Sequence, residues 1–68
     1  MADPNVWIPI QLLTGEEVSK ILRISRAYAY RLMKQGYIPT IRLGRSVRVS
    51  SESLLKFIQE NNKHGHDN

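Results

Sequence analysis

The chain has 68 residues, no cysteine and a formal net charge of +4. This length allows one small domain, which buries only about 60% of the surface of its unfolded chain. The absence of cysteine excludes disulfide bonds, thiolate metal sites and a cysteine nucleophile. The absence of cysteine also favours a reducing, intracellular setting, so we expect a cytoplasmic, nucleoid-associated protein. No apolar run approaches the roughly 20 residues that span a bilayer, so we expect it to be soluble and without a membrane partner.

Residues 1–11 are predicted to form an extended N-terminal segment that is partly packed. Three apolar side chains are expected to cover an open edge of the core: Trp7, Ile8 and Ile10. Pro9 keeps the segment out of any central strand, because it lacks an amide hydrogen for the ladder. The alternative is that Trp7 belongs to a surface that binds a partner.

A capping box predicts the start of the first helix at Thr14. In the sequence T-x-x-E, the Thr14 hydroxyl accepts from the Glu17 amide while the Glu17 carboxylate accepts from the Thr14 amide. Three apolar residues at helical spacing form its inner stripe: Val18, Ile21 and Leu22. We expect this helix to end around Arg23.

The second helix is predicted between Ser25, a favourable N-cap, and Gly36, which suits a left-handed residue after the last turn. Its apolar stripe consists of Ala29, Leu32 and Met33, with Tyr28 between this stripe and the opposite face. That opposite face carries three cations, one aromatic side chain and no acid: Arg26, Ala27, Tyr30, Arg31 and Lys34. A solvated face usually mixes charges of both signs, so this one favours a nucleic-acid partner.

The short connection between these helices predicts a helix-turn-helix, in which the first helix braces the second. Residues 40–49, TIRLGRSVRV, then alternate like a strand pair. A three-residue turn at 44–46 places Arg42 opposite Arg48 and separates the charged face from the apolar one. With Arg45 at the tip, we interpret this hairpin as a phosphate-binding wing. The alternative is an edge hairpin that charge protects from aggregation.

A last helix, capped by Ser50 or Ser51 and ending near Asn61 or Asn62, is predicted to close the core with one apolar side. This side consists of Leu54, Leu55, Phe57 and Ile58. Residues 62–68 are predicted to be a flexible tail. Its two histidines, His64 and His66, do not make a metal site by themselves, so we expect no metal and no cofactor.

The predicted fold is therefore mainly α with a small β-hairpin: a winged helix-turn-helix with three helices and a two-stranded wing, over residues 12–61. The motifs between Leu12 and Ile58 resemble, in this order and spacing, those of the excisionase-type DNA-binding domain, a relative of the MerR-like regulators. They are Leu-Thr before Glu-Glu-Val, Ile-Ser-Arg, Tyr-Arg-Leu before Gly36, Ile-Pro, and Arg-x-Gly-Arg in the hairpin. Gly15, Ser19 and Tyr28 depart from the usual residues of that family.

The resemblance implies a recognition helix in the major groove and a wing on the adjacent backbone or minor groove. Carried onto this sequence, the recognition-helix residues are Arg26, Ala27, Tyr28, Tyr30, Arg31 and Lys34, and the wing residues are Arg42, Arg45, Ser46 and Arg48. One such domain makes a small interface of roughly 600–1,000 Å², so we expect cooperative self-association on DNA or a second protein.

We therefore expect a small sequence-specific protein that binds double-stranded DNA, without enzymatic activity. The expected role is that of an excisionase (recombination directionality factor) of a mobile element, with an integrase or recombinase as partner. The alternatives are a transcriptional regulator with the same fold, and an adaptor to an integrase or polymerase that uses Trp7 and the last helix. RNA is less favoured, because the major groove of A-form RNA is too narrow for a helix.

Overall fold

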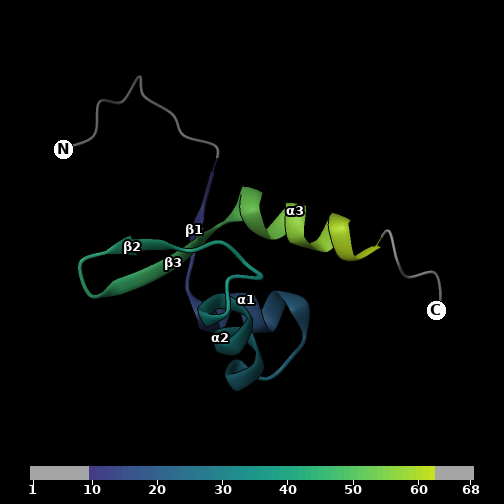
Figure 1. Ribbon diagram of the computed structural model, residues 1–68, viewed down its shortest axis with the longest axis horizontal. Helices are drawn as coiled ribbons and strands as arrows, with labels where there is room; N and C mark the ends of the chain where they lie inside the picture. The colour runs from purple at the N-terminus through teal and green to yellow at the C-terminus, as the bar shows by residue number, and fades with distance from the viewer. Residues whose placement is uncertain (1–9, 63–68) are drawn as a thin grey trace.

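Strand β3 (Ser46–Ser50) is the central strand of a three-stranded antiparallel sheet in the computed structural model, which describes residues 10–62. The strands β1 (Leu12–Leu13) and β2 (Ile41–Leu43) pair with its two edges. Helices α1 (Gly15–Leu22) and α2 (Arg26–Lys34) pack together beside the sheet, and α3 (Ser51–Asn62) continues from β3 (Figure 1). This arrangement confirms the predicted winged helix-turn-helix with three helices and a β-hairpin.

Strand β1 is an element that the sequence pattern did not predict. Leu13 lies opposite Val49, and just before it the Gln11 amide donates to Ser51 Oγ at 3.0 Å. A strand of two residues is too short for an alternating pattern to be recognised. Leu13 is buried, whereas Ile10 is 40% exposed, so the prediction that Ile10 covers the core is wrong. Trp7 and Ile8 lie outside the described residues.

Side-chain caps begin each of the three helices, as predicted. The Thr14 box is complete, because the Glu17 amide donates to Thr14 Oγ1 at 3.1 Å and the Thr14 amide donates to Glu17 Oε1 at 2.9 Å. At the start of α2, Ser25 Oγ accepts from the Tyr28 amide at 3.1 Å. Of the two serines considered for α3, Ser50 is the cap, and it accepts from the Ser53 amide at 3.0 Å.

Gly36 ends α2 in the left-handed conformation that its position predicts, with φ +87°. Its amide donates to the Met33 carbonyl at 3.2 Å, and the Tyr37 amide donates to the Leu32 carbonyl at 3.0 Å. This pair of bonds is the Schellman motif, which satisfies carbonyls at the end of a helix. The chain then turns back toward the sheet, and Ile38 enters the core.

The β2–β3 hairpin has a two-residue turn, so the predicted three-residue turn is wrong. Arg42 lies opposite Val47, and Arg48 lies opposite Ile41. Gly44 has φ +63°, and the only non-glycine residue with positive φ among the described residues is Arg23. A positive φ at the first turn position alone is the pattern of a type II′ turn, which takes Gly there and matches the twist of the strands. The prediction rested on keeping charged and apolar residues on separate faces of the hairpin, and the two-residue turn mixes them instead.

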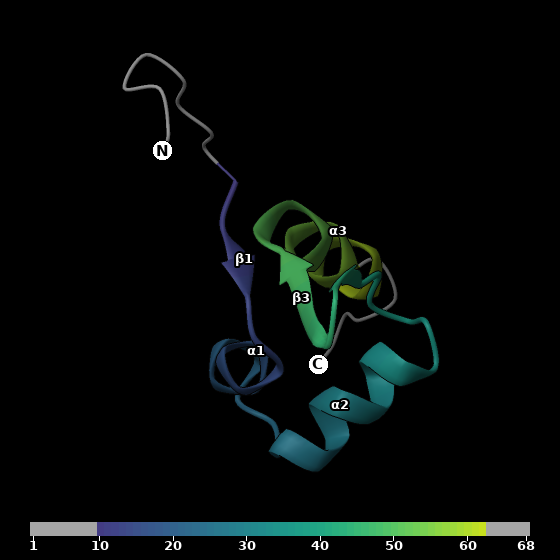
Figure 2. The ribbon, with the colours of Figure 1, turned by 90° about the vertical axis from the view of Figure 1, so that its left-hand side faces the viewer.

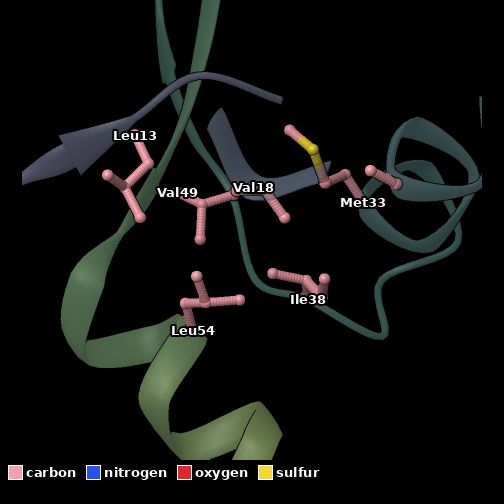
Figure 3. Packing of buried hydrophobic residues seen from close by; sticks show 7 residues of the cluster. Leu13, Val18, Met33, Ile38, Val49 and Leu54 are labelled. Atoms are coloured by element: carbon pink, nitrogen blue, oxygen red, sulfur yellow. The ribbon is translucent and has the colours of Figure 1, made fainter. Parts of the chain in front are cut away.

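The core lies between the helices and the sheet (Figure 3). Its buried side chains come from five elements and one loop: Leu13, Val18, Ala29, Met33, Ile38, Val49 and Leu54. Val18, Ile38 and Val49 are completely buried. One small cluster therefore fixes α2 relative to the hairpin.

Helix α3 contributes less to this core than its sequence predicts. Leu54 is buried and Phe57 packs against the cluster, but Leu55 and Ile58 are 54% and 39% exposed. The apolar side of α3 is wider than the surface available to cover it, so the prediction is wrong for these two residues. None of the helices in residues 10–62 combines the length and apolar content needed to cross a membrane.

Candidate nucleic-acid interface

Helix α2 turns one side to the core and the other to solvent. Ala29 and Met33 are buried, and Leu32 is half-buried. At 3.6 residues per turn, the side of the helix opposite to these residues carries Ala27, Arg31 and Lys34, which are all exposed. The helix contains no acidic residue of its own. Its outer side therefore exposes two cations, Arg31 and Lys34, to a ligand.

The turn between α1 and α2 places α2 across α1. Arg23 adopts a left-handed conformation, with φ 60° and ψ 45°, and the Ile24 amide donates to the Ser19 carbonyl at 3.0 Å. The left-handed residue changes the chain direction sharply. In Figure 2, α1 is seen nearly end-on while α2 runs across the view. Helix α1 thus supports α2 from the inside and leaves its outer side uncovered.

Arg26 has an internal acidic partner, which the sequence analysis did not foresee. Arg26 Nη1 lies 3.8 Å from Glu16 Oε1, and Lys20 Nζ lies 3.9 Å from Glu16 Oε2. The expectation that no acid meets this face is therefore wrong for Arg26. The Arg26 and Glu16 side chains are 69% and 51% exposed, so water and salt screen the pair strongly. Arg26 remains accessible to a ligand, in competition with Glu16.

The hairpin register decides where the wing arginines lie. Residues directly opposite each other in a sheet share a face, so Arg42 lies on the face of Val47, and Arg48 lies on the other face with Ile41. The predicted Arg42–Arg48 pair does not exist. Arg45 and Ser46 are exposed at the tip, as predicted. Arg48 is half-buried, and its Nη1 donates to the Val47 carbonyl at 3.0 Å.

A hollow of about 400 Å³ lies between α2 and the hairpin, and we call it the helix–wing hollow. It is lined by Tyr30, Met33, Lys34, Thr40, Arg42 and Val47. Lys34 comes from α2 and Arg42 from the hairpin, so the fold brings cations from both predicted surfaces to one place. The apolar floor, formed by Met33 and Val47, belongs to the core side of these elements.

The two tyrosines of α2 lie on different flanks of the helix. Tyr30 borders the helix–wing hollow, whereas Tyr28 lines a separate hollow next to α3, together with Tyr37 and Phe57. Arg31 also lines this second hollow. Of the predicted DNA-contact residues, Tyr28 is thus the one placed farthest round the helix from the wing.

Three residues at or near this surface were not singled out as contacts from the sequence: Gly15, Glu16 and Thr40. Glu16 contacts Arg26 across two helices, and no local pattern predicts such a tertiary pair. Gly15 stands out in the sequence only because it departs from the usual residues of the resembled family and because glycine is unfavourable in a helix, which is the available signal. Thr40 follows Pro39 directly. It lines the helix–wing hollow only because α2 lies beside it, and its local sequence does not predict this.

No metal centre is formed by the part of the chain that the structure describes, since no three His, Asp or Glu side chains are placed to share an ion there. His64 and His66 lie outside residues 10–62. The polar groups of the hollow and of the outer side of α2 are cations and hydroxyls, beside exposed aromatic rings. Such groups bind and orient an anionic polymer.

Comparison with known proteins identifies relatives of this chain. It is 43% identical over 44 residues to Rv0500A of Mycobacterium tuberculosis, which is named as a candidate DNA-binding protein; the alignment covers 65% of this chain and 56% of that protein. It is 41% identical over 44 residues to the uncharacterized protein YvgK of Bacillus subtilis, covering 65% of this chain and 14% of YvgK. It is 44% identical over 48 residues to VapB50 of M. tuberculosis, named as a candidate antitoxin, covering 71% of this chain and 37% of VapB50.

The chain thus spans about half, or less, of the length of these relatives. No solved structure matches it significantly. The model of a helix-turn-helix domain family matches residues 12–62, from β1 to the end of α3. Because this match covers the whole winged helix described above, the chain belongs to that helix-turn-helix domain family.

Proposed function

We propose that this protein binds double-stranded DNA in a sequence-specific manner, with α2 in the major groove and the β2–β3 hairpin against the neighbouring backbone. The observation that carries the proposal is the meeting of Lys34 and Arg42 in the helix–wing hollow. Arg31 is exposed on the same helix and Arg45 on the same hairpin. A helix and a hairpin that present cations side by side match the groove and the phosphate backbone of one duplex.

The proposed contacts divide into two groups by their elements. On α2, the contact residues are Arg26, Ala27, Tyr28, Tyr30, Arg31 and Lys34; Arg31 and Lys34 reach bases or phosphates, since both can donate to guanine. On the wing, they are Arg42, Arg45, Ser46 and Arg48, which contact phosphates. Phosphate contacts position the protein, and base contacts supply specificity.

For the biological role, we propose an excisionase of a mobile element that acts with an integrase or recombinase. The order of motifs from Leu12 to Ile58 supports this role, and so does the small size of one such interface, which favours several copies or a second protein on the DNA. A transcriptional regulator is the second candidate. It needs the same DNA-reading surface of α2 and the hairpin, and the similarity to a relative named as a candidate DNA-binding protein is compatible with it.

Charge reversal tests the DNA-binding proposal. Arg31→Glu and Arg45→Glu are each expected to weaken binding to a fluorescent duplex by at least about tenfold in anisotropy titrations. Lys56→Glu, an equal charge change on the exposed side of α3, is the matched control and should bind more tightly than either. Circular dichroism verifies that each variant is folded. Folded Arg31 and Arg45 variants that bind as tightly as Lys56→Glu would contradict the proposal and favour the adaptor role.

A second experiment distinguishes the two biological roles. A footprint is made on DNA flanking the gene, with and without a purified integrase from the same element. Adjacent protected sites that extend when integrase is added support the excisionase role. Protection confined to a promoter, without any effect of integrase, supports the regulator.

A further inference from the structure

Tyr30 lies between two hollows on the surface that carries the proposed function. On one side is the helix–wing hollow, with Lys34 and Arg42. On the other side is a third hollow, of about 400 Å³, which we call the α1–wing hollow. It is lined by Thr14, Gly15, Glu16, Tyr30, Arg45, Ser46, Val47 and Arg48. Each hollow therefore contains cations, and the half-exposed Tyr30 borders both, together with Val47.

The ring of Tyr30 occupies the space where a side chain at residue 15 would be. A Cβ atom on Gly15 would lie 2.5 Å from Tyr30 Cζ and 2.6 Å from Cε1, far inside contact distance. Gly15 is buried, although it is the first residue of α1 and Tyr30 is 48% exposed. Helix formation does not explain this glycine, because Gly is about 1 kcal/mol less favourable than Ala in a helix.

The contact joins the supporting helix to the recognition helix at the surface, outside the core. Tyr30 is not part of the core cluster of residues 10–62, and without a neighbour its ring would be free to rotate about its side-chain torsions. With the ring lying on Gly15, its hydroxyl end is held at the N-terminus of α1, beside the α1–wing hollow. Glu16 also lines that hollow, and its carboxylate pairs with Lys20 and Arg26.

We propose that Gly15 is a positioning residue for DNA binding. By lacking a side chain, it fixes the Tyr30 ring as the partition between two hollows, each of which receives a phosphate of the DNA backbone. Lys34 and Arg42 contact the phosphate in the helix–wing hollow, and Arg45 and Arg48 contact the one in the α1–wing hollow. The Tyr30 hydroxyl donates to a phosphate at this boundary. This inference rests on the proposed function, since it assumes that DNA is the ligand.

A double-mutant cycle tests the inference, with Gly15→Ala, Tyr30→Ala and the double variant measured on one mixed-sequence duplex. Each single variant is expected to weaken binding by about tenfold, as befits the loss of a hydrogen bond to a charged group. The double variant is expected to bind no more weakly than Tyr30→Ala alone, because Gly15 acts only through Tyr30. Tyr37→Ala is the matched control, an exposed tyrosine away from both hollows, and should bind like the wild type.

Urea unfolding of the wild type and the three variants of the cycle gives an independent measurement. Gly15→Ala should raise the unfolding midpoint less when Tyr30 is present than in the Tyr30→Ala background, because the Tyr30 ring must leave its place in the first case and only the helix preference of alanine acts in the second. Losses of affinity that multiply in the double variant, or a Gly15→Ala variant that binds normally, would overturn the inference. If the wild type itself fails to bind the duplex, it is the proposed function that fails, and the unfolding cycle still decides whether Gly15 positions Tyr30.

Discussion

Replacing Glu16 by glutamine should weaken the fold slightly and strengthen DNA binding. The carboxylate lies 3.8 Å from Arg26 Nη1 and 3.9 Å from Lys20 Nζ, with side chains that are 51–76% exposed. At this exposure each ion pair contributes about 0–1 kcal/mol to stability. The negative charge in the first turn of α1 adds about 0.3–1 kcal/mol through the helix dipole. Glu16→Gln should therefore lower the free energy of unfolding by about 1 kcal/mol.

The effect on affinity has the opposite sign. The substitution removes a negative charge from the α1–wing hollow and frees Arg26 for a phosphate. One additional phosphate contact steepens the dependence of log K on log salt by about 0.9. Combined with the loss of one repulsive charge, it should raise the affinity for a duplex by about 3- to 10-fold at 0.1 M salt.

Anisotropy titrations and urea unfolding measure the two effects on the same protein. Glu52→Gln is the matched control, because Glu52 is an exposed acid in the first turn of α3. Glu52→Gln should lower the free energy of unfolding by the helix-dipole contribution, with little gain in affinity for the duplex. An unchanged or weaker affinity for Glu16→Gln would refute the reasoning, and an equal gain in both variants would show that only net charge matters.

Three further substitutions test the fold that supports the interface, each by urea unfolding. Ile38→Ala empties a completely buried site and should cost about 2–5 kcal/mol, whereas Ile38→Val should cost about 0.5–1.5 kcal/mol; similar values for both would contradict the packing described. Gly44→Ala should cost about 1–2 kcal/mol, because φ is +63° at this residue. The new Cβ would meet no atom within 4 Å, so the cost comes from the backbone conformation and not from a clash. A neutral Gly44→Ala would argue against the two-residue turn. Thr14→Ala should cost about 1 kcal/mol by breaking the capping box, and no loss would show that water replaces this cap.

Sequence reasoning succeeded where the determining interactions are local. The caps at Thr14 and Ser25 and the left-handed Gly36 depend on residues within one turn, and all three predictions are confirmed. The order of these signals is sufficient to predict the helix-turn-helix and its wing. The burial of Ala29 and Met33 follows from their spacing within α2.

It failed where two rules competed or where the partner is distant in sequence. In the hairpin, the separation of charged and apolar faces favoured a three-residue turn, but the conformation of Gly44 selects two residues and moves Arg42 to the face of Val47. The Glu16–Arg26 contact depends on the crossing of α1 and α2, which no spacing encodes. The contact between Gly15 and Tyr30 depends on the same crossing.

The central claim is that cations of the recognition helix and of the wing act together on one DNA duplex. The most direct test is the salt dependence of duplex binding for the wild type, Lys34→Gln and Arg42→Gln. With about six phosphate contacts, log K should fall against log salt with a slope near −5, and each substitution should make the slope shallower by about 1. A wild-type slope near zero, or slopes that neither substitution changes, would contradict the account.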